Sequence, residues 1–306
     1  MNAVRTEADT TPASIRTLLS NVIDYAGLFP PSQLTMAEAV INYATYRNRN
    51  QAWMLGRFCV PAARLFEFIE IAEDPIRRDK DRIWHLAAIA GEDIYETINI
   101  VRDFNRRFAA TAAIADVIEV RANTVSKIEN TLSAMPSGIT PYFEIPIGEE
   151  LPELVSALAL HGQRAKIRTG GTTPEAFPTS RQIIRFVRTC MAANVSFKAT
   201  AGLHHPLRCY KPLTYEENAP RGTMHGFLNM LVMTGFARES YRISLLEQIL
   251  EDEFEEAFEF GDGVTWRGEH FLGNAQLGWL RQKGMHSFGS CSFDEPVEDL
   301  RSLGLL

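Results

Sequence analysis

Six charged residues stand at the ends of short apolar segments, where they could take part in chemistry: Glu119, Arg121, Glu144, Lys166, Arg168 and Lys198. A lysine amine is a nucleophile only when neutral, and its ordinary pKa of about 10.4 must therefore be lowered by burial or by a second cation. Lys166 and Lys198 end successive segments, so each could be that second cation for the other, with Arg168 as a third. The combination fits Schiff-base chemistry on a carbonyl compound. The same cations could instead simply bind an anionic substrate.

The segments that carry these residues alternate with stretches of helical spacing. Short apolar runs separated by amphipathic helices indicate a parallel sheet. Their regular succession favours a closed barrel over an open sheet, and no G-x-G-x-x-G motif follows the first strand. The sequence therefore predicts an α/β fold, a (β/α)₈ TIM barrel with an N-terminal extension and an insertion after strand 6. The expected strands are Trp53–Val60, Ile83–Ala90, Asp116–Val120, Thr140–Ile147, Ala165–Thr169, Val195–Thr200, Val264–Trp266 and His286–Ser290.

Strand alternation predicts which way the charged side chains point. Successive strand residues face opposite sides of a sheet. Lys166 and Arg168 share one face, while the apolar Ile167 between them suits contact with the helices. The same reasoning directs Glu119, Arg121, Tyr142, Glu144, Lys198 and Thr200 into the barrel. An ion-pair network that plugs the barrel is one explanation, but such networks stabilise weakly compared with apolar packing. Clusters of this kind also mark sites with perturbed pKa values.

Two of these strand ends resemble a known family. Lys166-Ile-Arg-Thr-Gly170 is similar to the K-x-x-T-G strand end of the deoxyribose-phosphate aldolase family, and Lys198-Ala-Thr-Ala-Gly202 is similar to its next motif, K-A-[ST]-x-G. The resemblance implies that Lys166 is the Schiff-base lysine and that Lys198 lowers its pKa. It covers residues 166–202 alone. Arg168 stands where the family has a small polar residue, and the chain continues beyond Lys198 for longer than the family's chains do.

His204 and His205 follow the predicted sixth strand, at the mouth of the expected barrel. Either could be a general acid or base near neutral pH, or a loop histidine bonded to backbone. A metal site could combine one of them with Glu144, His225 or His270. No H-x-H or H-E-x-x-H spacing supports such a site, and we predict neither a metal nor a cofactor.

Glycines at the strand ends could present backbone N–H groups to an anionic substrate, or they could be ordinary turn residues. Together with the charged side chains at the mouth they complete the expected substrate-binding set. That set is Arg168, Arg121, Glu119, Thr200, His205, Gly170, Gly171, Gly202 and Ser290.

Composition narrows the class of protein. The 306 residues carry a formal net charge of −7, which argues against nucleic acid and against a membrane surface as partners. The four cysteines form no C-x-x-C pair, so free, mostly buried thiols in a reducing compartment are expected. Residues 1–12 lack the apolar core of a signal peptide, and the longest apolar run, Gly226–Ala237, is interrupted by Asn229. We therefore expect a cytoplasmic protein.

Two domains are predicted: residues 1–34 as an extension that covers the barrel, and residues 35–306 as the barrel itself. The loop Asp24–Pro31 mixes apolar and polar residues without a period. It could cover either end of the barrel.

The leading functional hypothesis is an aldolase-like lyase that acts on a small anionic carbonyl compound through a Schiff base on Lys166. Glu144 or His204 would move protons. The alternatives are a metal-assisted isomerase or hydrolase on the same mouth, and a non-catalytic barrel that binds a small anion or a partner protein. The sequence leaves open the identity of the substrate and the oligomeric state, a homo-oligomer included.

Overall fold

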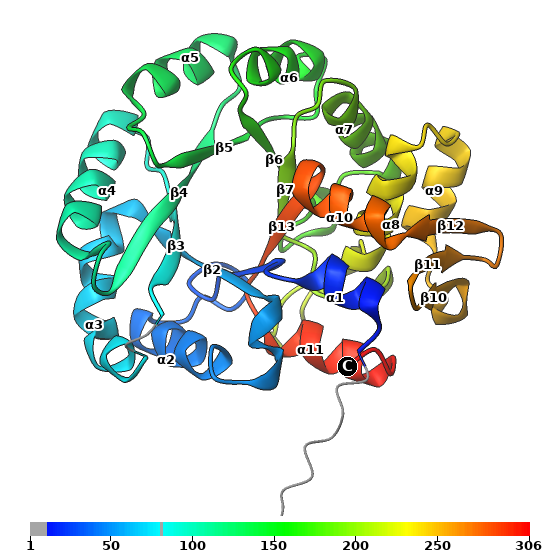
Figure 1. Ribbon diagram of the computed structural model, residues 1–306, viewed down its shortest axis with the longest axis horizontal. Helices are drawn as coiled ribbons and strands as arrows, with labels where there is room; N and C mark the ends of the chain where they lie inside the picture. The colour runs from blue at the N-terminus through cyan, green and yellow to red at the C-terminus, as the bar shows by residue number, and fades with distance from the viewer. Residues whose placement is uncertain (1–10, 80–81) are drawn as a thin grey trace, which may run out of the picture.

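The computed structural model describes residues 11–79 and 82–306. Within them, eight parallel strands close into a barrel in the order β1-β13-β7-β6-β5-β4-β3-β2, and helices surround it (Figure 1). The predicted (β/α)₈ barrel is therefore confirmed. The strands are β1 (Ile23–Tyr25), β2 (Leu55–Pro61), β3 (Trp84–Ile89), β4 (Ala113–Arg121), β5 (Thr140–Glu144), β6 (Arg164–Arg168), β7 (Phe197–Thr200) and β13 (Met285–Ser290).

The first barrel strand lies where an extension was expected. β1 pairs with β13 through Asp24↔Gly289 and with β2 through Ile23↔Leu55, so it closes the barrel. Residues 23–25, within the predicted extension of residues 1–34, are thus part of the barrel itself. Residues 1–10 of that extension lie outside the described part. A strand of three residues, all buried, is too short to show an alternating pattern.

The prediction of a barrel strand at Val264–Trp266 was wrong. This segment belongs to β11 (Gly263–Trp266), which pairs antiparallel with β10 (Phe258–Phe260) and β12 (His270–Gly273) in a small separate sheet. A strand of four residues looks the same in either setting, because periodicity does not distinguish a barrel strand from a hairpin strand. With β1 included, the barrel needs no strand here.

The insertion between β7 and β13 is confirmed, after the strand that the sequence predicted as its sixth. It begins with a ribbon of two antiparallel strands, β8 (Cys209–Pro212) and β9 (Arg221–Met224). Two helices, the small sheet and a third helix follow. These helices are α8 (Phe227–Arg238), α9 (Ile243–Glu251) and α10 (Asn274–Lys283).

The remaining helices form the outer ring, and each has one buried stripe. In α4 the buried positions Ile94, Ile98, Val101 and Phe104 recur every three or four residues. Thr35 caps α2 together with Glu38 in a capping box, which fixes where that helix begins. These helices are α1 (Ala13–Leu19), α2 (Met36–Tyr46), α3 (Leu65–Arg78), α4 (Ile94–Phe108), α5 (Val125–Ala134), α6 (Leu151–Leu160), α7 (Ser180–Ala192) and α11 (Asp294–Ser302).

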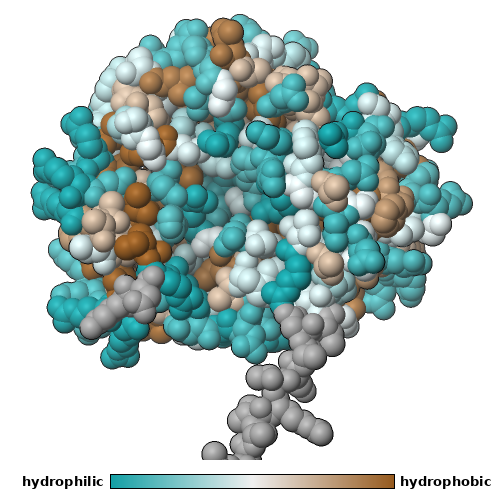
Figure 2. Space-filling model, in the orientation of Figure 1, coloured by the Kyte–Doolittle hydropathy of each residue, from teal (hydrophilic) through white to brown (hydrophobic). Residues whose placement is uncertain are grey.

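The apolar core lies between the strands and this ring. The outward strand residues Ile118, Ile167 and Ala199 belong to it, as alternation predicted. Hydrophilic residues prevail over the centre of the face in Figure 2, whereas apolar patches gather over the helical ring. In the part of the chain that the structure describes, helices capable of crossing a membrane are absent.

Candidate active site at the C-terminal mouth of the barrel

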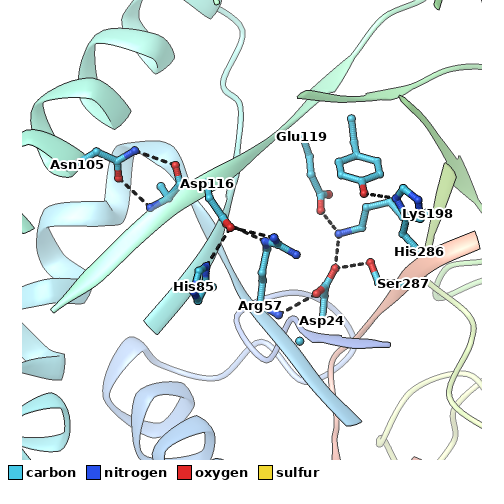
Figure 3. A network of polar contacts seen from close by, with 12 residues as sticks. Asp24, Arg57, His85, Asn105, Asp116, Glu119, Lys198, His286 and Ser287 are labelled. Atoms are coloured by element: carbon cyan, nitrogen blue, oxygen red, sulfur yellow. Dashed lines mark hydrogen bonds and ion pairs between the residues drawn. The ribbon is translucent and has the colours of Figure 1, made fainter. Parts of the chain in front are cut away.

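Five charged side chains meet inside the barrel in a chain of ion pairs, the ion network Asp24–Lys198–Glu119–Lys166–Glu144. The Lys166 Nζ lies 2.6 Å from Glu119 Oε2 and 2.7 Å from Glu144 Oε2. Lys198 donates to Asp24 and to Glu119 Oε1 (Figure 3). Glu119 therefore bridges the two lysines. The network follows from strand register, because Lys166 pairs with Glu144 across β5 and β6 and with Lys198 across β6 and β7.

Opposite charges shift the pKa values of Glu119 and Lys198. Burial alone would raise the pKa of Glu119, but the ammonium groups of Lys166 and Lys198 lower it to about 2. Burial would lower the pKa of Lys198, but the carboxylates of Asp24 and Glu119 hold it well above its ordinary value. Lys198 is therefore not the uncompensated cation that the sequence led us to expect beside Lys166.

A second polar layer lies beneath the ion network and holds Asp24 in place. The Asp24 carboxylate accepts hydrogen bonds of 2.8 Å from the Arg57 backbone N–H and from Ser287 Oγ. The guanidinium of Arg57 makes two bonds, of 2.8 and 2.9 Å, to Asp116, which His85 also contacts (Figure 3). The strands on both sides of β1, β2 and β13, thus hold the Asp24 carboxylate in position for its contact with Lys198.

Arginines flank the network at the mouth. Arg168 Nε lies 3.3 Å from Glu144 Oε1, and Arg121 Nε lies 3.7 Å from the same oxygen. The exposed fraction of the side chain rises outward, from 6% at Lys166 to 14% at Glu144, 45% at Arg168 and 83% at Arg121. The charged residues therefore form a graded path from the solvent to the Lys166 amine.

A cavity of about 850 Å³ opens above the network and gathers most of the predicted site. Lys166 and Glu144 lie at its wall. Predicted residues that line it are Glu119, Arg121, Glu144, Lys166, Arg168, Gly171, Thr200, Gly202 and His204.

Four predicted residues do not line this cavity. Lys198 is buried beneath it, with 2% of its side chain exposed. His205 is held by Asp299 of α11 at 2.6 Å. The Ser290 Oγ is buried and accepts a bond of 3.4 Å from the Ser292 backbone N–H. Gly170 is a packing residue, as described next.

Gly170 and Gly202 allow two strand ends to come together. A Cβ on Gly202 would lie 2.8 Å from the Gly170 Cα, and Gly202 adopts φ +77°, in the left-handed region. The Thr169 hydroxyl donates a 2.6 Å bond to the carbonyl of Ala201 across the same junction. These glycines are thus required by packing between β6 and β7.

The loop after β1 covers the C-terminal mouth of the barrel. From the sequence, the loop Asp24–Pro31 could have covered either end. Ala26, Phe29, Pro30 and Pro31 line the cavity. They do so because the carboxyl ends of all barrel strands meet at one face, where the active sites of this fold lie. The apolar wall that they form faces the charged wall around Glu144.

His204 meets a cysteine that the sequence analysis did not select. Cys291, the first residue after β13, has its Sγ 3.8 Å from His204 Nδ1, and Glu295 Oε2 lies 3.3 Å from the same nitrogen. The Tyr215 hydroxyl lies 3.6 Å from this Sγ and 3.0 Å from Glu295 Oε2. Cys291 and His204 both line the cavity. β7 and β13 are neighbours in the barrel, so the residues that follow them emerge side by side.

Within residues 11–79 and 82–306, no three His, Cys, Asp or Glu side chains are grouped so that they could hold a metal ion. In the same part of the chain, all four cysteines are free, and three of them are buried, as the sequence predicted.

Comparison of the chain with protein-family models and with curated proteins finds no match.

Proposed function

We propose that this barrel is an enzyme of the lyase class that binds a small anionic carbonyl compound and forms an imine on Lys166. The observation that carries the proposal is the buried Lys166 amine at the wall of the cavity, held between Glu119 and Glu144. A buried amine that a ligand can reach is a candidate nucleophile. The resemblance of the strand ends at Lys166 and Lys198 to those of the aldolase family supports the same hypothesis.

Imine formation at this amine needs a proton acceptor. Glu144 is suited to that role because it contacts Lys166 and lines the cavity. The neutral amine adds to the carbonyl carbon, the carbonyl oxygen leaves as water, and the nitrogen keeps one proton in the iminium ion. Overall, ammonium and carbonyl give iminium and water, and Glu144 returns the proton that it borrowed. Glu119 bridges both lysines and remains ionised, so it orients Lys166.

The rim explains why the ligand should be an anion. Arg168 and Arg121 are partly exposed cations next to Glu144, and a guanidinium binds carboxylate or phosphate through paired hydrogen bonds. A ligand anchored there by its anionic group would present its carbonyl carbon to Lys166.

Borohydride reduction tests the imine directly. The protein is incubated with glyoxylate or pyruvate, reduced, digested and mapped by mass spectrometry, with acetaldehyde as the uncharged comparison. We expect the adduct on Lys166, more of it with the anions, and none on Lys166→Arg, because guanidinium forms no imine. Lys127→Arg is the matched control, since Lys127 lines the same cavity and should not matter for the adduct.

The alternatives give other results. Equal binding of the anion to wild type and to Lys166→Arg, without any adduct, would replace the proposal with a non-catalytic anion-binding barrel. If a chelator abolishes trapping and a divalent ion restores it, the alternative of a metal-assisted isomerase or hydrolase would be favoured.

A further inference from the structure

A second nucleophilic centre lies at the same mouth, in the cluster Cys291–His204–Glu295–Tyr215 described above. Its members come from four separate segments: the residue after β13, the loop after β7, helix α11 and the loop between β8 and β9. His204 and Tyr215 contact the Cys291 sulfur, and Glu295 contacts both of them. Cys291 is only 5% exposed but borders the cavity. Ser32, in the loop that covers the mouth, donates a 3.3 Å hydrogen bond to the Cys291 carbonyl and holds this residue from above.

We propose that Cys291 and His204 form a thiolate–imidazolium pair whose Sγ attacks electrophilic carbon in the cavity, with small anionic aldehydes as the ligand class. A thiol beside an imidazole transfers its proton to the ring, and the thiolate is the reactive form. Attack forms the S–C bond, the electron pair of the C=O π bond moves to oxygen, and that oxygen takes the proton from His204. The product is a hemithioacetal, and the reverse steps release the ligand, so no oxidant or further reactant is consumed.

The groups around the sulfur favour the charged pair. Burial would raise the pKa of Cys291, but the contact with His204 and the neighbouring hydroxyl groups of Ser32 and Tyr215 lower it. Burial would likewise lower the pKa of His204, but Cys291 and Glu295 raise it to about 10.

Two more groups complete the surroundings of the pair. The pKa of Glu295 is lowered: burial opposes this, but contact with His204 and Tyr215 outweighs it. Burial raises the pKa of Tyr25 to about 12, so that hydroxyl stays neutral.

The other cysteines differ from Cys291 and provide internal controls. Burial raises the pKa of Cys59 and of Cys190, and it raises that of the half-buried Cys209 to about 11. Cys209 is less buried than Cys291. If access alone governed reactivity, Cys209 would react faster. If thiolate content governs it, Cys291 would react faster.

Alkylation with iodoacetamide, mapped by mass spectrometry between pH 5 and 10, separates these cases. A thiol of pKa about 11 is thiolate in about one part in ten thousand at pH 7, so we expect Cys291 to react at least tenfold faster than Cys209 at that pH. In His204→Asn, the midpoint of the Cys291 profile should move upward by at least one pH unit, with the far-UV circular dichroism unchanged. A wild-type midpoint above pH 8.5, or one that His204→Asn leaves in place, would overturn the thiolate pair.

The carbonyl step is tested in Lys166→Met, where no imine can form. Glyoxylate should slow the alkylation of Cys291 in this variant as it does in wild type. Protection that requires Lys166 would refute addition at sulfur while leaving the imine proposal intact. If glyoxylate protects Cys291 in wild type but borohydride traps no adduct, the imine proposal would be refuted while addition at sulfur would stand. Failure of one proposal is therefore distinguishable from failure of the other.

Discussion

Replacing Glu119 by Gln removes the charge that bridges the two lysines of the ion network while keeping nearly the same volume. The pKa of Glu119 falls from its ordinary 4.5 to about 2 in the folded protein, because burial is outweighed by the ammonium groups of Lys166 and Lys198. Each unit is worth about 1.4 kcal/mol, so the ionised carboxylate contributes about 3 kcal/mol to stability at neutral pH. Breaking a buried pair by removing one partner typically costs about 3–5 kcal/mol, which agrees in size.

The sign of the pH dependence follows from the lowered pKa. A carboxyl group whose pKa is lower in the folded state contributes its full stability above the unfolded pKa and loses it as the pH falls through the folded pKa. The destabilisation of Glu119→Gln should therefore shrink from about 3 kcal/mol at pH 7 to about 1 kcal/mol at pH 3. An alternative cause, such as altered packing, would give a loss that does not depend on pH.

Urea unfolding, followed by tryptophan fluorescence and by far-UV circular dichroism, measures this difference where the two probes coincide. Glu67→Gln is the matched control, since Glu67 on helix α3 forms an exposed ion pair with Arg64, which precedes that helix. This substitution should change the free energy of unfolding by less than about 1 kcal/mol. Stability of Glu119→Gln equal to that of wild type at pH 7, or an equal loss at pH 7 and pH 3, would refute the assignment of a buried ionic bridge.

Two further substitutions test the packing of the mouth and its binding of anions. Gly202→Ala should destabilise the protein by about 1–3 kcal/mol in urea unfolding, because of its positive φ and the approach to Gly170. Gly261→Ala, where a Cβ meets nothing within 4 Å, should be close to neutral. Arg168→Met should weaken glyoxylate binding, measured by calorimetry, by about tenfold without a comparable loss of stability. Arg188→Met, on the exposed face of α7, should leave that affinity unchanged, and equal affinities in the two arginine variants would contradict the role of Arg168.

Alternation along the strands was enough to predict four members of the ion network. Glu119, Glu144, Lys166 and Lys198 point inward because their neighbours on the other face pack against helices. What alternation does not reveal is the pairing between them. The sequence suggested two lysines acting on each other, whereas the intervening Glu119 gives each a carboxylate partner. Pairing depends on the length and reach of side chains across strands, which a one-dimensional pattern does not contain.

Asp24 and Cys291 were missed for different reasons. Asp24 lies on a strand of three residues inside a segment with no period, so the sequence carries no signal for its inward position. Cys291 did have a signal. It follows the last barrel strand directly, and His204 follows the preceding barrel strand by four residues. Residues just beyond neighbouring strands meet at the mouth of a barrel, and applying that rule to cysteine as well as to lysine and histidine would have selected it.

In the proposed function, the exposed charges at the rim bind the anion, and the buried charges below them take part in the chemistry. The ion network holds three carboxylates and two ammonium groups, so its floor carries an excess of negative charge and offers no attraction to an anion. The attraction comes from the rim, where Arg121 and Arg168 are exposed and face the same Glu144 oxygen. An anion that displaces these guanidinium groups from Glu144 would also free that carboxylate to take the proton from Lys166. Ligand binding at the rim would then itself activate the amine below, so a neutral carbonyl compound should react more slowly at the chemical step as well as bind more weakly.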